Sequence, residues 1–121
     1  NALIKAPHAE TVIHDHGRSW TLYGVLEGGE RVARFTAKDV APGETPNRAE
    51  IEADGETQVG SGYIDLVAPS KAHAEYNGPQ RTVAVIGRSE KSGGFVQNCF
   101  EPETGNVGQY YGPTQIPYRL A

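Results

Sequence analysis

The sequence has little cysteine and no long apolar run. Cys99 is the only cysteine among 121 residues, which excludes an internal disulfide framework and fits a reducing compartment. No run reaches the roughly 18 apolar residues that a membrane-spanning helix needs. Residues 1–5 are too short and too polar for a signal peptide. We therefore expect a cytoplasmic protein without a membrane partner.

An excess of positive charge is also absent. Eleven Lys and Arg residues stand against fifteen Asp and Glu residues, and the formal net charge is -4. The basic residues are scattered, so a phosphate backbone would meet no positive field and we expect no nucleic-acid partner. The length suits a single domain over residues 1–121. The first residue is Asn rather than Met, which leaves open that an N-terminal segment is missing.

Glycine and proline punctuate what we predict to be an all-β chain. Fifteen Gly and eight Pro residues recur between short segments rich in Val, Ile, Tyr, Phe and Thr, and no comparable helix signal is present. Short strands in a small domain must close on themselves or pack as two sheets, so we expect a jelly-roll barrel. The predicted strands are residues 2–6, 11–16, 20–26, 31–38, 48–53, 63–67, 73–76, 82–87, 95–100 and 107–110, with turns at 27–30, 54–55 and 77–79.

Two segments are predicted at the periphery of this barrel. Residues 48–56 come nearest to a helical pattern, but their apolar residues alternate with period two, which favours an edge strand. Residues 110–121 contain Pro113 and Pro117 and are expected to form an extended arm rather than a barrel strand. This arm would lie either across the partner subunit of a homodimer or on its own barrel.

Two histidines lie two residues apart in the predicted strand at residues 11–16. Because alternate side chains of a strand share a face, His14 and His16 point the same way and can chelate a metal ion. Two imidazoles alone bind weakly, so a third ligand is required. His73 is the only histidine downstream and precedes a predicted turn. We predict a metal site formed by these three residues.

Two further candidate ligands are set aside on similar grounds. Asp15 lies between the paired histidines and therefore points to the opposite face. His8 lies six residues before His14 and would share its face if the strand were unbroken, but Pro7 beside it argues for an edge or a bend. The alternative in which the histidines bind no metal, as surface or hydrogen-bonded core residues, stays open.

Three stretches resemble motifs of the cupin superfamily, in the form found in cysteine-dioxygenase-like thiol dioxygenases. Residues 13–28 (IHDHGRSWTLYGVLEG) resemble the first metal motif. Residues 68–77 (APSKAHAEYN) resemble the second motif, in which a proline-bearing turn delivers the last histidine. Residues 98–106 (NCFEPETGN) resemble a turn on a late hairpin. The resemblance implies a cupin double-stranded β-helix whose metal ligands are His14, His16 and His73.

The same resemblance implies a non-haem Fe(II) dioxygenase that acts on a small anionic thiol or related substrate with O2. Many cupins add a carboxylate four or five residues after the second histidine, where this chain has Trp20 and Thr21. That absence indicates an all-histidine site, which leaves positions open for a bidentate anionic substrate and O2. Ni, Zn, Mn or Co would fit the same imidazoles in a purified sample.

The chain departs from the thiol dioxygenases after the second motif. Where that group has a Ser-x-His-x-Tyr series, this chain has Ala84, Ile86 and Arg88. An inward-facing Arg88 would offer a forked cation to a substrate carboxylate, so we name it a candidate catalytic residue; the alternative is a solvated arginine. Trp20 is a second candidate, as an apolar wall of the pocket, with core packing as its alternative.

Two other functions compete with thiol oxidation. A three-histidine cupin that cleaves a diketone-like chelating substrate with O2 needs no Ser-x-His-x-Tyr series. A binding or sensing module would keep the metal and lack catalysis. Oxygen uptake with candidate thiols and diketones separates these interpretations.

Overall fold

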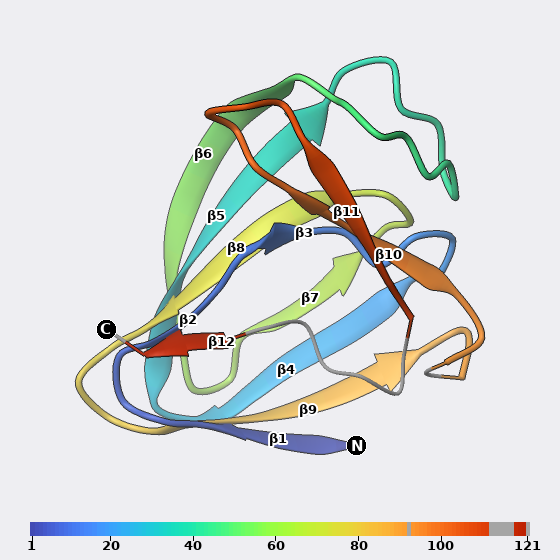
Figure 1. The fold of residues 1–121 in the computed structure, drawn as a ribbon. Coiled ribbons are helices and arrows are strands. Elements are labelled where there is room, and N and C mark those ends of the chain that lie inside the picture. The colour runs from blue at the N-terminus through green and yellow to red at the C-terminus, as the bar shows by residue number, and fades with distance from the viewer. Residues whose placement is uncertain (92, 112–117, 121) are drawn as a thin grey trace.

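The computed structural model describes residues 1–91, 93–111 and 118–120 of the chain. These residues form twelve β-strands and no helix (Figure 1), which confirms the all-β prediction. Nothing in this part of the chain could therefore cross a membrane as a helix. The strands are β1 (Ala2–Lys5), β2 (Ala9–Thr11), β3 (Ile13–His14), β4 (Thr21–Glu27), β5 (Gly29–Ala37), β6 (Ile51–Gly60), β7 (Ile64–Val67), β8 (Ala72–Asn77), β9 (Thr82–Arg88), β10 (Val96–Phe100), β11 (Val107–Tyr111) and β12 (Tyr118–Leu120).

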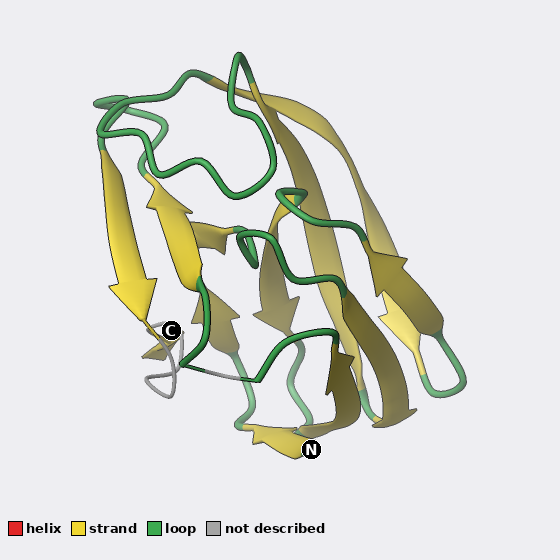
Figure 2. Ribbon diagram, turned by 90° about the vertical axis from the view of Figure 1, so that its right-hand side faces the viewer, coloured by secondary structure: helices red, strands yellow, loops and turns green. Residues whose placement is uncertain are grey.

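The strands form two antiparallel sheets. The smaller sheet has the order β1-β9-β4-β7, and the larger has the order β11-β10-β3-β8-β2-β12, with β5 paired to β8 and to β6. Most connections pass from one sheet to the other, as from β4 to β5 and from β8 to β9 (Figures 1 and 2). Such alternation winds the chain into two facing layers, which is the arrangement of a jelly roll.

The space between the sheets holds a small apolar core and many polar side chains. One cluster joins the sheets through Tyr23, Val25 and Ala84 on one side and Val32 and Val59 on the other. A second cluster packs at the β10–β11 side of the larger sheet, around Phe100 and Val107. Thirteen polar or charged residues are also buried, among them all three predicted metal ligands. The interior is therefore arranged around polar groups as well as around a core.

The segment at residues 48–60 differs from its prediction in one respect. The predicted turn at residues 54–55 is wrong, because both residues lie inside β6. The register between β5 and β6 shifts there, since Arg34 pairs with Gly55 and Phe35 with Ala53. Gly55 has a φ of 117°, so its glycine serves a β-bulge rather than a reversal. The predicted edge position is confirmed, because β6 pairs only with β5 among the described strands.

The C-terminal segment is a strand where the structure describes it. Residues 112–117 and 121, which include Pro113 and Pro117, lie outside the described residues. Tyr118–Leu120 pairs antiparallel with Ala9–Thr11, so β12 forms the edge of the larger sheet of its own chain. The prediction of an arm that is not a strand is therefore wrong for these three residues. The unpaired edge of β2 supplies the backbone groups that stabilise them.

Candidate metal centre

Three histidines converge on the inner face of the larger sheet. His14 ends β3 and His73 lies in β8, and the two residues are paired directly across the strands. Their side chains therefore leave the sheet on the same face. His16 follows two residues after His14. The three residues are 3%, 7% and 6% exposed, in the order His14, His16 and His73.

The rings lie at distances that suit a shared metal ion. Their centroids are 5.3 Å apart for His14 and His16, 4.6 Å for His14 and His73, and 5.0 Å for His16 and His73. One ring nitrogen of each residue lies within 4.8 Å of the others. Imidazole ligands bind at about 2.0–2.1 Å, which places ligand nitrogens within roughly 4 Å of one another. Small rotations of the rings would therefore let all three bind one ion.

Hydrogen bonds orient two of the three rings. His14 Nδ1 lies 2.9 Å from the carbonyl oxygen of Val12. Because a carbonyl only accepts, Nδ1 carries the proton and Nε2 keeps its lone pair for a metal. His16 Nδ1 is hydrogen-bonded to the buried hydroxyl of Thr21. From the sequence, Thr21 was considered only for its lack of a carboxylate, and hydrophobicity along β4 does not indicate that it points inward.

Burial keeps the three imidazoles neutral. Burial lowers the pKa of His14. It lowers the pKa of His16 well below the ordinary value, and the neighbouring His73 and His14 add to that effect. The pKa of His73 is also well below its ordinary value, because of burial first and His14 second. Neutral imidazoles are the form that binds metal ions, so at neutral pH no proton has to leave before a metal binds.

We expect the metal-free protein to lose stability as the pH falls below about 6.5, the ordinary pKa of histidine. In that range the unfolded chain binds protons at its histidines while the folded chain still excludes them, because its imidazole pKa values are lowered. The unfolded state then binds more protons, so the free energy of unfolding falls with pH. Urea unfolding in a chelator at pH 7.5, 6 and 5 measures this slope.

The matched variants are His16→Gln and His8→Gln. The first removes a buried histidine of the cluster and should make the pH dependence shallower. The second changes an exposed residue outside the cluster and should leave the slope as in the wild type. Equal slopes in all three proteins would contradict the prediction.

The histidines line a cavity of about 350 Å³ that lies between the sheets. Cavities of this size hold small molecules. The wall is partly apolar, with Phe35, Ile86 and Phe95 among its side chains. The charged residues that line it are Arg34, Asp54, Asp65, Lys71, Glu75 and Arg88. The arrangement can therefore place a small polar molecule beside the histidines and shield it from bulk water.

Arg88 faces this cavity, as its candidate role requires. It ends β9 and lies on the same face of that strand as the buried Ala84 and the cavity-lining Ile86. Arg88 lines the same cavity as the three histidines. Its contact with a substrate stays a prediction. The side chains of Ala84, Ile86 and Arg88 contain no hydroxyl, imidazole or phenol.

Trp20 does not have the position that was predicted for it. The described residues that line the histidine cavity do not include Trp20, which is 43% exposed. Thr21, the next residue, points inward, so strand alternation turns Trp20 outward. It lines a separate hollow with Leu22, Leu66, Ala68 and Pro69. The prediction of Trp20 as a pocket wall is therefore wrong, and Phe35 and Phe95 provide apolar wall instead.

Two other residues have no place in the cluster. His8 is exposed and has a φ of 60°, in the bend that its neighbouring proline indicated. Cys99 is half-buried in β10. Burial first, and the nearby Asp15 second, raise the pKa of the Cys99 thiol to about 12, so it stays protonated at neutral pH. A thiol in that state is a poor nucleophile.

Asp15 is buried and fixes the loop that carries His16. Its carboxylate accepts hydrogen bonds from the backbone of Gly17 at 2.9 Å and from the backbone and side chain of Asn98 at 2.8 and 2.9 Å. Gly17 has a φ of 56°, and a Cβ there would lie 2.1 Å from the carbonyl oxygen of Val96. Glycine is therefore required immediately after His16. The prediction that Asp15 points away from the histidines agrees with these contacts.

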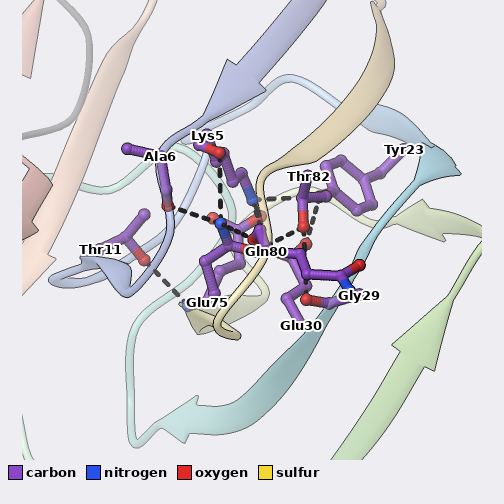
Figure 3. A network of polar contacts seen from close by, with 10 residues as sticks. Lys5, Ala6, Thr11, Tyr23, Gly29, Glu30, Glu75, Gln80 and Thr82 are labelled. Carbon is purple, nitrogen blue, oxygen red and sulfur yellow. Dashed lines mark hydrogen bonds and ion pairs between the residues drawn. The ribbon is translucent and has the colours of Figure 1, made fainter.

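A buried charged network, shown in Figure 3, was not predicted from the sequence. Lys5 Nζ lies 2.8 Å from Glu30 Oε2 and 3.4 Å from Glu75 Oε1, and it donates to the Tyr23 hydroxyl at 3.0 Å. The Tyr23 hydroxyl also donates to Glu30. Glu75 lines the cavity two residues after His73. Strand alternation from His73 was the signal for Glu75, whereas nothing local indicated Lys5.

Burial acts in the same direction on the two carboxylates of this network, but the net shifts of their pKa values are opposite. It raises the pKa of Glu30, although the Lys5 ammonium acts against that rise. Burial also opposes ionisation of Glu75, but the Lys5 charge and the His14 and His16 rings outweigh it, so the pKa of Glu75 is lowered. Glu75 is thus held as an anion near the metal ligands.

The fold is shared with solved structures, although no family model and no curated protein matches the chain. Coconut allergen cocosin is 15% identical with a TM-score of 0.58 over 81% of the chain. An oxalate oxidase is 17% identical with a TM-score of 0.53 over 93%. A sugar phosphate isomerase of the cupin superfamily from Silicibacter pomeroyi is 12% identical with a TM-score of 0.52 over 97%. The chain spans 22%, 44% and 69% of these proteins.

These similarities establish the fold. The chain has the cupin double-stranded β-helix, as its motifs implied. Identities this low carry no activity from one protein to another, so membership of the thiol-dioxygenase-like group stays a prediction. Within that fold, this chain holds a cluster of three buried histidines that can bind a metal ion.

Proposed function

We propose that this chain is a non-haem Fe(II) dioxygenase of the thiol-dioxygenase-like group that acts on a small anionic substrate. The observation that supports the proposal best is the cluster of three neutral, buried histidines at a cavity that Arg88 also lines. Within the described residues this cluster contains no carboxylate. The cytoplasmic location and the small-molecule substrate with O2 remain predictions.

The residues present fit a divalent metal ion. His14, His16 and His73 would hold it, and the Val12 carbonyl and the Thr21 hydroxyl fix two of their rings. When bound, Fe(II) would supply the oxygen chemistry that amino-acid side chains lack. Apolar wall residues exclude water from the cavity and so strengthen the electrostatic interactions inside it.

Arg88 is the group that we assign to the substrate anion. Arg34 also lines the cavity, and it donates to the Tyr63 hydroxyl at 2.7 Å and pairs with Asp65 at 3.5 Å. Arg88 ends its strand beside the histidines, where a forked guanidinium can bind a carboxylate in a fixed orientation.

A second candidate function is cleavage of a chelating, diketone-like substrate. The observation that favours it is Ile86, which lines the cavity where thiol dioxygenases have a histidine. With Ala84 beside it, this face cannot supply the hydrogen-bonded relay of that group. A substrate that binds the metal through two of its own oxygens needs no such relay.

Oxygen uptake distinguishes these functions. Protein loaded anaerobically with Fe(II) is mixed with O2 and with cysteine, 3-mercaptopropionate or a β-diketone. We expect uptake with one substrate class. For a carboxylate-bearing substrate, we expect Arg88→Met to raise KM by about 10- to 100-fold with a smaller change in kcat, the loss of one charge-assisted hydrogen-bonded pair.

Arg81→Met is the control, because Arg81 pairs with Glu27 at the protein surface, away from the cavity. It should leave both kinetic constants unchanged. Tight metal binding without uptake of O2 for any of the three compounds would speak against the oxygenase and for a binding or sensing module.

A further inference from the structure

The outer face of the smaller sheet is apolar from β1 across to β7. Strand alternation places the polar residues of this sheet inward, among them Lys5, Thr21 and Arg88. Glu27 lies on the outer side, because it pairs with Val83 after a β-bulge in β4. The other side chains that point outward are Ala2, Ile4, Leu22, Gly24, Leu26, Ile64, Leu66, Val83, Val85 and Gly87. Each of them is alanine, glycine, valine, leucine or isoleucine. We call this set the apolar face.

This pattern is the reverse of the one expected for a sheet whose outer side is in water. An antiparallel sheet with one solvated side normally alternates apolar residues inward with polar residues outward. Here the large side chains of the apolar face are well exposed, from 43% for Leu22 to 71% for Ile64. Soluble monomers rarely expose a continuous apolar patch larger than a few hundred Å². The face therefore requires a covering partner.

The exposed side chains are neighbours across the strands. Leu22 pairs with Leu66 on β7 and with Gly87 on β9. Gly24 lies between Ile64 and Val85 in the same way. With Trp20 at one end, seven large apolar residues on this side are at least 43% exposed. A stable interface takes about 800 Å² from each partner, so an apolar surface that spans all four strands of the sheet is of the kind that an interface needs.

We infer that this face docks on the same face of a second copy of the chain. A surface that is almost entirely apolar needs no oppositely charged partner, and a two-fold axis brings such a surface against itself. The nearest charged residues at one end, Arg81 and Glu27, already pair with each other at 3.1 Å. They neither repel a second copy nor require an ion from it.

The shape of the apolar face suits packing against the same face of a second copy. Gly24 and Gly87 have no side chains and lie between leucine, isoleucine and valine, which leaves low points beside ridges. The hollow at Trp20, Leu66 and Pro69 continues the face at one end. Ridges of one copy can enter the low points of the other. The histidine cavity lies on the opposite side of this sheet, so docking leaves the metal centre intact.

Sedimentation equilibrium of the whole chain across a dilution series tests the inference. We expect a dimer for the wild type. Leu22→Lys places two like charges in a symmetric interface and should weaken the dimer by about 100-fold or more. Ile64→Lys, on the adjacent strand, should do the same. Tyr111→Lys is the control, since Tyr111 is an exposed apolar residue of the larger sheet, and its dimer should match the wild type.

Circular dichroism and Co(II) binding at the histidines confirm that each variant is folded, and they keep this test separate from that of the proposed function. A wild-type chain that is monomeric at every concentration would overturn the inference, as would a dimer that neither lysine variant weakens. A monomer that co-sediments with phosphatidylcholine vesicles would also overturn it, in favour of a lipid surface.

Discussion

Replacing Lys5 with methionine is expected to lower the free energy of unfolding by about 3–5 kcal/mol. Lys5 and Glu30 are almost completely buried, and their charged atoms are 2.8 Å apart. Methionine fills the space of the lysine stem but leaves the carboxylates of Glu30 and Glu75 without their cation. Two uncompensated negative charges inside a barrel of low polarity are the source of the loss.

Urea unfolding of wild type and Lys5→Met at pH 7.5 measures this loss, and Arg81→Met is the matched control. Arg81 and Glu27 form an ion pair of similar length, but both side chains are exposed to water. Exposed pairs contribute about 0–1 kcal/mol. A Lys5 variant that loses no more stability than the Arg81 variant would show that the buried pair is not structural.

The pH dependence of the Lys5 variant provides a second check. Burial raises the pKa of Glu30, and Lys5 acts against that rise. Without Lys5, the folded state binds a proton at Glu30 at higher pH than the unfolded state does. Stability contributed by this group therefore increases as the pH falls. We expect the difference between variant and wild type to narrow between pH 7.5 and pH 5.

The strands could be predicted because their signals are local. Period-two alternation and glycine or proline between segments predicted ten strands, which account for eleven of the twelve, with β2 and β3 merged into one and β12 missed. Most bounds agree to within a few residues, but β6 extends to Gly60, seven residues beyond its predicted end. The proximity of the three histidines could be predicted for a related reason. His14 and His16 share a strand face, and the motif around His73 implied the third position.

The contacts around the histidines could not be predicted in the same way. Lys5 reaches Glu30 and Glu75 through pairings between strands that are far apart in sequence, and no local pattern encodes those pairings. The error over Trp20 has another cause. In the smaller sheet the polar side chains point inward and the apolar ones outward, so hydrophobicity does not indicate which face of β4 is buried. Only the positions of the neighbouring strands decide it.

Replacing His73 with alanine is expected to weaken binding of a divalent metal by well over 100-fold. His73 supplies one of three ligands. The loss of a hydrogen-bond partner behind a ligand already lowers metal affinity by about 10- to 100-fold. Calorimetric titration of the metal-free protein with Co(II), with circular dichroism as the check on folding, measures the affinity. His8→Ala is the control, because His8 is exposed and outside the cluster, and it should bind as the wild type does.

Thr21→Val separates the ligand role from the orienting role at this site. Valine has nearly the shape of threonine but cannot hydrogen-bond His16 Nδ1, so the ring loses its orientation while the ligand set stays complete. We expect this variant to weaken Co(II) binding by about 10- to 100-fold, between the control and His73→Ala. The rise of the Tm on adding Co(II) should rank the variants in the same order. A metal that binds only the folded state stabilises it in proportion to the logarithm of its affinity. If Thr21→Val bound Co(II) as tightly as the wild type, the hydroxyl would have no part in positioning His16. If His73→Ala did so, the metal centre itself would be disproved.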